Sequence, residues 1–229
     1  MAEPSPPPPP SSTDATPQPP PTGPITLRLP SKYVSNSSTS SSSDSFVAPP
    51  LDWLRRTWSV THSTLSMWRT AQNVRITYAA YPSSSSSSYP PGTNDNLVEY
   101  EKNDGKGGVK SVAGIERPDP KIPAAWKWRG KGLLAIASSH WEVLGWGERP
   151  LAGGEGEGVE RWAVTWFAPT LFTQEGLDIY TDRKEGLSKE TAAEIIAVLK
   201  KLEGAPKLVD MVEKDMQEVA IKLPWKENN

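Results

Sequence analysis

The two histidines are the side chains of this sequence best suited to acid–base chemistry near neutral pH. His62 shares the alternation of Trp58 and Val60 and is therefore expected to point into the interior, while His140 precedes Trp141 at the start of another apolar run. A general base needs a group that orients it and a substrate within reach, and no triad neighbour or G-x-S-x-G motif accompanies either histidine. The plainer interpretation of each is a satisfied polar residue. We expect no catalytic residue.

Metal and cofactor chemistry find no support in the residue types. The chain contains no cysteine, which excludes a thiolate nucleophile, a disulfide framework and a cysteine-ligated zinc site. The two histidines lack the spacing of a paired metal site. We therefore expect neither a metal nor a cofactor.

Aromatic side chains are the other conspicuous group, with ten tryptophans in the chain. On three runs they share one face in strict alternation with polar or small residues: Val74, Ile76 and Tyr78; Trp126 and Trp128; Trp162, Val164 and Trp166. Aromatic walls with a few polar groups are typical of ligand pockets, but indole rings can equally fill a core. Both interpretations stay open at this point.

Short alternating runs separated by turn residues predict the strands that must carry these side chains. The predicted strands cover residues 57–64, 73–81, 96–103, 108–116, 124–129, 132–138, 140–147, 160–168 and 176–182. Strands at such regular spacing indicate a barrel or a sandwich rather than a parallel sheet with crossover helices.

The pattern changes to a helical period after the last strand. In 187–204, Ser188 can serve as the N-cap and apolar residues recur on one stripe, at Ile195, Leu199 and Leu202. A second helix is expected at about 207–219, with Leu208, Met211 and Val212 inward. The stripe needs a surface to cover, and the outer wall of the strands is the expected one.

Residues 1–48 are mostly Pro, Ser and Thr and are expected to form a disordered arm. The stretch Pro17 to Pro20 fits a P-x-x-P pattern, so an SH3 or WW partner is one possible reading and plain low complexity the other. A net charge of −2 argues against a nucleic-acid partner, and no apolar run has the length of a membrane span. No signal-peptide pattern follows Met1, so a cytoplasmic location is expected.

Two segments resemble the lipocalin family. Residues 58–78 look like its first strand, irregular loop and second strand, beginning at the tryptophan Trp58, and 183–201 look like its last strand and helix, with Arg183, Leu187 and Ser188 at the family's spacing. Arg56 stands where the family has glycine. The chain resembles intracellular lipocalin-like proteins of fungi in particular.

The resemblance implies a mainly β protein, a single antiparallel up-and-down β-barrel of eight to ten strands with a C-terminal α-helix packed on its wall. The barrel and its helices would occupy 49–221, followed by a tail at 222–229. It also implies that Arg183 stacks on Trp58 at the closed end in a cation–π contact, with a structural role for both residues. The loop that carries Met67 and Trp68 would partly cover the open mouth.

Together, these features predict a protein that binds a small hydrophobic molecule inside the barrel without transforming it. The candidate ligand-binding residues are His62, Trp68, Ile76, Tyr78, Trp126, Trp128, Trp162, Val164 and Trp166. One alternative is an isomerase or cyclase of a small hydrophobic metabolite, with His62 or Tyr78 moving the proton. Another is an interaction scaffold that uses the proline-rich arm.

Overall fold

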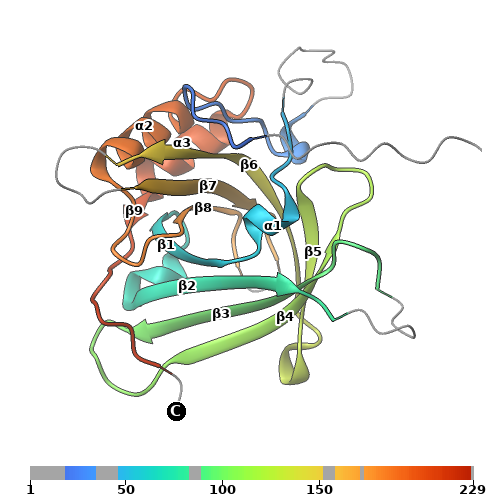
Figure 1. The fold of residues 1–229 in the computed structure, drawn as a ribbon, viewed down its shortest axis with the longest axis vertical. Helices are drawn as coiled ribbons and strands as arrows, with labels where there is room; N and C mark the ends of the chain where they lie inside the picture. The colour runs from blue at the N-terminus through green and yellow to red at the C-terminus, as the bar shows by residue number, and fades with distance from the viewer. Residues whose placement is uncertain (1–18, 35–45, 83–88, 152–157, 171–172, 228–229) are drawn as a thin grey trace, which may run out of the picture.

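The structure is a computed structural model that describes residues 19–34, 46–82, 89–151, 158–170 and 173–227. The described chain forms one antiparallel sheet that closes on itself, with two helices against one side (Figure 1). No helix of the described residues is long and apolar enough to cross a membrane.

Eight strands follow one another around the barrel in chain order. They are β1 Thr57–Ser63, β2 Ala71–Ala80, β3 Asn94–Lys102, β4 Lys110–Pro118, β5 Ala125–Gly130, β6 Ser138–Pro150, β7 Val159–Phe167 and β8 Gly176–Thr181. Each pairs with its neighbour in sequence, and β1 pairs with both β2 and β8, so the sheet has no break. The predicted up-and-down barrel is confirmed, and the sandwich alternative is excluded. A short ninth strand, β9 Gln217–Glu218, extends the edge of β1 near the mouth.

The predicted strand at 132–138 is wrong. Residues Gly132–Leu134 form a 3₁₀ turn, η3, which starts at a positive φ of 58° at Gly132. Leu133 has a relative exposure of 101%, so its apolar side chain reaches solvent instead of packing on a neighbouring strand. An apolar run forms a strand only where its side chains pack against neighbouring residues, and those of this run do not.

Two helices cover the outer wall of β6, β7 and β8, as predicted (Figure 1). Helix α2, Lys189–Leu199, starts at the N-cap Ser188, whose hydroxyl accepts a hydrogen bond from the Thr191 amide. Helix α3, Pro206–Asp215, ends before the predicted residue 219 because the chain there pairs as β9. Buried Glu160 on β7 ties α2 to the wall by accepting hydrogen bonds from the Ser188 amide at 2.8 Å and the Thr191 hydroxyl at 2.6 Å.

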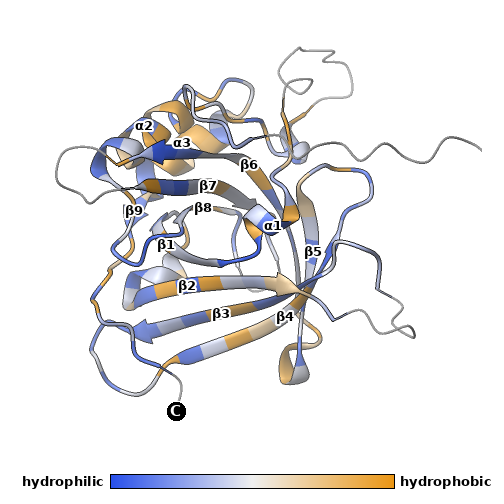
Figure 2. Cartoon of the chain, viewed as in Figure 1, coloured by the Kyte–Doolittle hydropathy of each residue, from blue (hydrophilic) through white to orange (hydrophobic). Residues whose placement is uncertain are grey.

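The barrel therefore has two separate cores, one inside the sheet and one between sheet and helices. Figure 2 shows apolar and polar residues alternating along β2, whose apolar members Val74, Ile76 and Tyr78 belong to the inner core. The outer core contains Leu177 and Ile179 of β8 together with Ile195, Leu199 and Leu208 of the helices. Strands β7 and β8 thus bury both of their faces.

Part of the expected arm is packed on the barrel, which corrects the prediction for residues 19–34. Ile25 is buried in the outer core. The Arg28 amide donates to the Leu144 carbonyl at 2.9 Å, and its guanidinium lies 3.2 Å from the buried carboxylate of Glu142. A 3₁₀ turn, η1 Ser31–Tyr33, follows. Residues 1–18 and 35–45 of the predicted arm lie outside the described residues, and so does the first half of the P-x-x-P stretch, 17–18.

The C-terminal segment after β9 covers the outer face of β2 and β3. The Lys222 amide donates to the Asn73 side-chain oxygen at 2.7 Å, and the Lys226 amide donates to Glu101 at 3.0 Å. The Arg75 guanidinium lies 5.0 Å from the centre of the Trp225 ring. The described part of the predicted tail, 222–227, therefore packs on the barrel wall.

A short helix, α1 Leu51–Leu54, closes one end of the barrel. The Trp58 indole is fully buried beneath it and donates to the Leu54 carbonyl at 2.8 Å. The Arg56 guanidinium lies 5.7 Å from the centre of the Trp58 ring. Arg183 forms an ion pair with Glu160 at 3.7 Å, and its stacking on Trp58 stays a prediction.

Candidate ligand-binding site

The interior of the barrel is filled at the closed end and hollow toward the mouth. Below, Trp126 stacks on Trp141 with ring centres 4.6 Å apart, and Trp141 stacks on Tyr78 at 5.4 Å. Trp53 and Trp146 meet edge to face at 4.7 Å nearer the end. These rings form a packed floor. Aromatic side chains therefore fill the barrel at its closed end, as in a core, and line a hollow nearer the mouth, as in a pocket.

Above this floor lies a cavity of about 260 Å³. Its wall comes from all eight strands or the loops that join them, and it is mostly apolar and aromatic: Leu65, Met67, Trp68, Ile76, Tyr78, Val98, Tyr100, Val112, Trp128, Ala137, Trp141 and Phe167. The polar lining consists of Asn96, Glu116, Ser138, Ser139, Thr170, Thr173 and Asp178. Few polar groups on an apolar wall are typical of a small-molecule site.

The mouth is narrowed by the 3₁₀ turn η2, Ser66–Thr70, which joins β1 to β2. The Trp68 ring points inward, is only 6% exposed and meets Tyr100 edge to face at 5.6 Å. The neighbouring Met67 is 48% exposed and also lines the cavity. The Met67 and Trp68 side chains therefore form an apolar rim that partly covers the cavity.

Trp128 is held in one orientation on the cavity wall. Its indole N–H donates to the Asn96 side-chain oxygen at 3.0 Å, across β4 from its own strand. Gly114 on β4 makes room for this ring, because a Cβ at that position would lie 2.0 Å from the Trp128 indole nitrogen. A glycine on one strand therefore fixes where an aromatic wall residue of the next strand lies.

Two buried acids face this apolar space. Burial raises the pKa of Asp178 to about 7, although the Ser63 hydroxyl, which donates to Asp178, and the charge of Arg69 oppose the shift. Burial also raises the pKa of Glu116 well above its usual range, against the influence of the Trp141 indole and the Asn94 amide. Both side chains are therefore largely protonated in the folded protein below neutral pH.

Tyr78 lies between these acids at the bottom of the cavity. Its pKa is raised first by burial and then by the nearby Tyr180, Glu116 and Asp178 side chains. A phenol with a raised pKa stays neutral at neutral pH and can take part in hydrogen bonds without supplying a base.

Of the predicted binding residues, the structure brings Trp68, Ile76, Tyr78 and Trp128 together on the cavity wall. Trp126 lies inside the barrel but one layer lower, beneath Trp141. Whether these residues bind a ligand stays a prediction.

The predicted inward placement of Trp162, Val164 and Trp166 is wrong. These three side chains belong to the core beneath the helices, and the inward face of β7 carries Ala163 and Phe167 instead. Because α2 and α3 cover this strand, both of its faces are apolar, and the larger side chains are on the outside.

The predicted inward placement of His62 is also wrong. The pairing of β1 with β8 shifts at a bulge between Val60 and His62, and Ser63 beyond the bulge contacts the interior Asp178. His62 therefore points outward, opposite Glu218 of β9, and burial lowers its pKa. Of the two residues expected to move the proton in an isomerase or cyclase, His62 is therefore not on the cavity wall, whereas Tyr78 is.

Glu116, Asp178 and Trp141 are cavity residues that the sequence did not identify as such. One signal was available for Asp178, since it is the single charged residue in the apolar run 176–181. Glu116 stands beside an arginine at the end of its predicted strand and carries no comparable signal.

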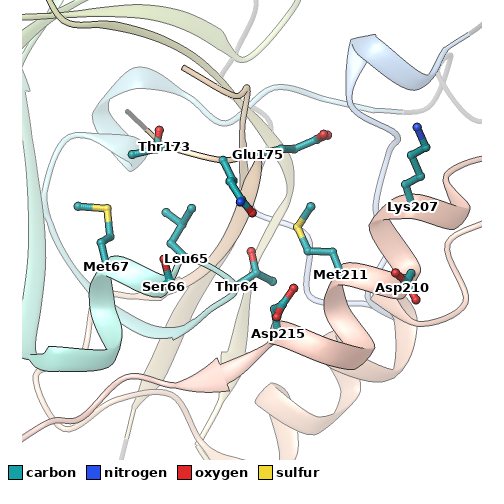
Figure 3. Close-up of a pocket in the computed structure, with 11 residues that line it drawn as sticks. Thr64, Leu65, Ser66, Met67, Thr173, Glu175, Lys207, Asp210, Met211 and Asp215 are labelled. Carbon is teal, nitrogen blue, oxygen red and sulfur yellow. The ribbon is translucent and has the colours of Figure 1, made fainter. Parts of the chain in front are cut away.

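A second hollow of about 610 Å³ lies outside the barrel, between η2, the segment before β8 and helix α3 (Figure 3). It shares Leu65, Met67 and Thr173 with the inner cavity, so the two meet at the mouth. Two of its charged groups have partners in the protein: Glu175 binds Tyr33 and Lys32, and Asp210 binds Lys214. Its lining is mainly polar, whereas that of the inner cavity is mainly apolar, so it is the weaker candidate for a site that selects a small apolar molecule.

The described residues contain no group of three or more His, Asp or Glu side chains arranged to hold a metal ion. The chemistry that the cavity offers is therefore that of apolar contact, aromatic faces and two carboxyl groups.

Comparison with protein-family models finds no match, and comparison with curated proteins finds none either. Among solved structures, the chain is similar to lobster apocrustacyanin A1, with 10% identity and a TM-score of 0.41, and to apocrustacyanin C1, with 11% identity and a TM-score of 0.43. Each alignment covers 73% of this chain and 77% of the other. The fold assignment rests on the strand pairing described above.

Proposed function

We propose that the protein binds a small, mainly apolar molecule in the cavity of its barrel and does not transform it. The observation that carries this proposal is the mostly apolar hollow above the stacked floor of Tyr78 and Trp141. An interior packed for stability alone leaves few voids larger than a water molecule. A hollow of about 260 Å³ on an apolar wall is far larger than that.

The volume limits the ligand to about one or two rings. An apolar cavity of about 150 Å³ accepts benzene, and drug-sized ligands occupy about 300 Å³ or more. The cavity described here lies between these sizes at about 260 Å³. A monocyclic molecule with a short side chain fits this space.

The indole N–H signals of the tryptophans provide the test. In a ¹⁵N-labelled sample titrated with 2-phenylethanol, we expect saturable shifts of the Trp68, Trp128 and Trp141 indole signals, because these rings line the cavity. The signals of Trp162 and Trp166, beneath the helices, stay in place. Single Trp→Phe variants assign the five signals.

A matched pair of variants separates binding in the cavity from binding elsewhere. Val112→Phe fills the hollow and abolishes the shifts, whereas Val159→Phe adds the same bulk at an exposed position of β7 and leaves them unchanged. Absence of any saturable shift in the wild type, or shifts that survive in Val112→Phe, would refute the proposed site.

A further inference from the structure

Glu116 presents an unsatisfied oxygen within the cavity wall. The residue is 2% exposed, and its Oε2 atom accepts no well-aligned hydrogen bond from the described part of the chain, although the Trp141 indole and the Asn94 amide lie close enough to lower the pKa of the carboxyl. On β4 it shares its face with Val112 and Gly114, which also point toward the interior. A buried polar atom without a partner costs free energy unless something else supplies the bond.

The ionisable groups on the wall are all acids or phenols. Glu116, Asp178, Tyr78 and Tyr100 line the cavity, and no Lys, Arg or His of the described residues does. Arg69, the cation that acts on Asp178, is not part of the wall and donates to the Ser63 and Asp215 carbonyls. A ligand carboxylate would be buried beside two acidic groups with no cation on the wall to neutralise it.

Aromatic rings line the same space. Trp128 and Tyr78 line it together with Glu116, and Trp141, stacked between Trp126 and Tyr78, contributes the edge of its ring. The faces of such rings attract cations, and an ammonium group gains from aromatic walls and a carboxylate at once. The wall therefore offers stabilisation to a positive charge at the point where the oxygen of Glu116 lacks a partner.

We propose that the cavity selects small apolar molecules that carry a protonated amine, with Glu116 as the group that receives the ammonium. The inference rests on the proposed function, since it names the ligand class for the same cavity. Asp178, on the other side of Tyr78, is the second acid facing this space. A ring with a short aminoalkyl chain has both the size and the charge that the site requires.

Calorimetric titration with three probes of similar shape tests the selection. At pH 7, we expect 2-phenylethylamine to bind at least about tenfold more tightly than 2-phenylethanol, the difference that one charge-assisted hydrogen bond produces. Phenylacetate binds more weakly than either. Equal or tighter binding of the alcohol would overturn the choice of an amine while leaving the cavity as a binding site. If none of the three binds, the proposed function fails as well.

The variant Glu116→Gln tests the assignment of the receiving group. It keeps the shape of the side chain and relieves a buried acid, so it is expected to fold, and it removes the preference for the amine over the alcohol. Glu190→Gln, at an exposed position of α2, is the matched control and keeps the preference. A preference that survives in Glu116→Gln would contradict the assignment.

Proton release gives a second readout that a change of shape alone would not affect. Binding of the ammonium favours the charged form of Glu116, so the carboxyl of Glu116 releases a proton when the amine binds at pH 7. This release appears as a dependence of the binding heat on the ionisation enthalpy of the buffer. The phenols that interact with Glu116 are Tyr78 and Tyr180, Asp95 acts on it from β3, and Asp178 acts on the same two phenols. We expect the release to fall in Glu116→Gln. The same release in both proteins would assign it to another group and contradict the proposal.

Discussion

Replacing Asp178 by Asn should change how the stability of the protein depends on pH. The carboxyl is 1% exposed, and burial raises its pKa from 3.8 to about 7. In the unfolded chain the same group ionises near the lower value. The folded state therefore binds more protons between about pH 4 and pH 7, so the free energy of unfolding falls as the pH rises through that interval and levels off above it.

The size of the effect follows from the two pKa values. Each pKa unit corresponds to about 1.4 kcal/mol, so a shift from 3.8 to about 7 corresponds to a loss of about 4 kcal/mol across the interval. Asp178→Asn cannot ionise and keeps an oxygen that can accept from the Ser63 hydroxyl. The difference in stability between wild type and variant should therefore move in the variant's favour by about this amount as the pH rises.

Urea unfolding at pH 4.5, 5.5, 6.5 and 7.5 measures this difference directly. Groups whose pKa is lowered by folding, such as Glu142, affect both proteins equally and cancel in the comparison. The control is Asp52→Asn, whose side chain is 99% exposed and should leave the profile of the wild type unchanged. Parallel stability profiles for wild type and Asp178→Asn would show that the carboxyl is not buried as described.

Three further changes test the fold around the site. Trp126→Ala should lower the free energy of unfolding by roughly 3–5 kcal/mol in urea titrations, because it removes the ring packed beneath Trp141. A loss below about 1 kcal/mol would mean that the floor of the cavity is not packed. Ser188→Ala should cost about 1 kcal/mol through loss of the α2 cap, and an unchanged stability would contradict that capping contact. Removing residues 1–34 should lower the Tm relative to removing 1–18, since it also deletes the contacts of Ile25 and Arg28; equal melting temperatures would show that 19–34 does not stabilise the barrel.

The barrel and its helices could be predicted because each depends on local patterns. Alternating runs between turn residues gave the eight barrel strands within a few residues, and Ser188 marked the start of α2 correctly. The exception, 132–138, has the composition of a strand but no partner to cover it.

The site was only partly predictable because the direction of a side chain depends on what covers the strand. On β2 the inner face alone is apolar, and the inward placement of Ile76 and Tyr78 was correct. On β7 the helices bury the outer face as well, so alternation could not distinguish inside from outside for Trp162 and Trp166. A single bulge between Val60 and His62 reversed the direction of the His62 side chain, and the residue types in this stretch do not predict a bulge.

Segment 19–34 illustrates a different difficulty. The Pro-, Ser- and Thr-rich composition of residues 1–48 suggested disorder here too, but Ile25 is buried against the outer wall and Arg28 forms an ion pair with Glu142. These contacts join residues more than a hundred positions apart, as between Arg28 and Val143, and no local pattern reports them.

Crystals of the protein under xenon pressure test the central claim most directly, because xenon enters dry apolar cavities and needs no ligand chemistry. The account predicts an ordered xenon peak inside the barrel, between Trp128, Val112 and Phe167 and above the Tyr78 ring. A barrel interior without xenon, filled from floor to mouth by side chains or occupied by ordered water, would contradict it.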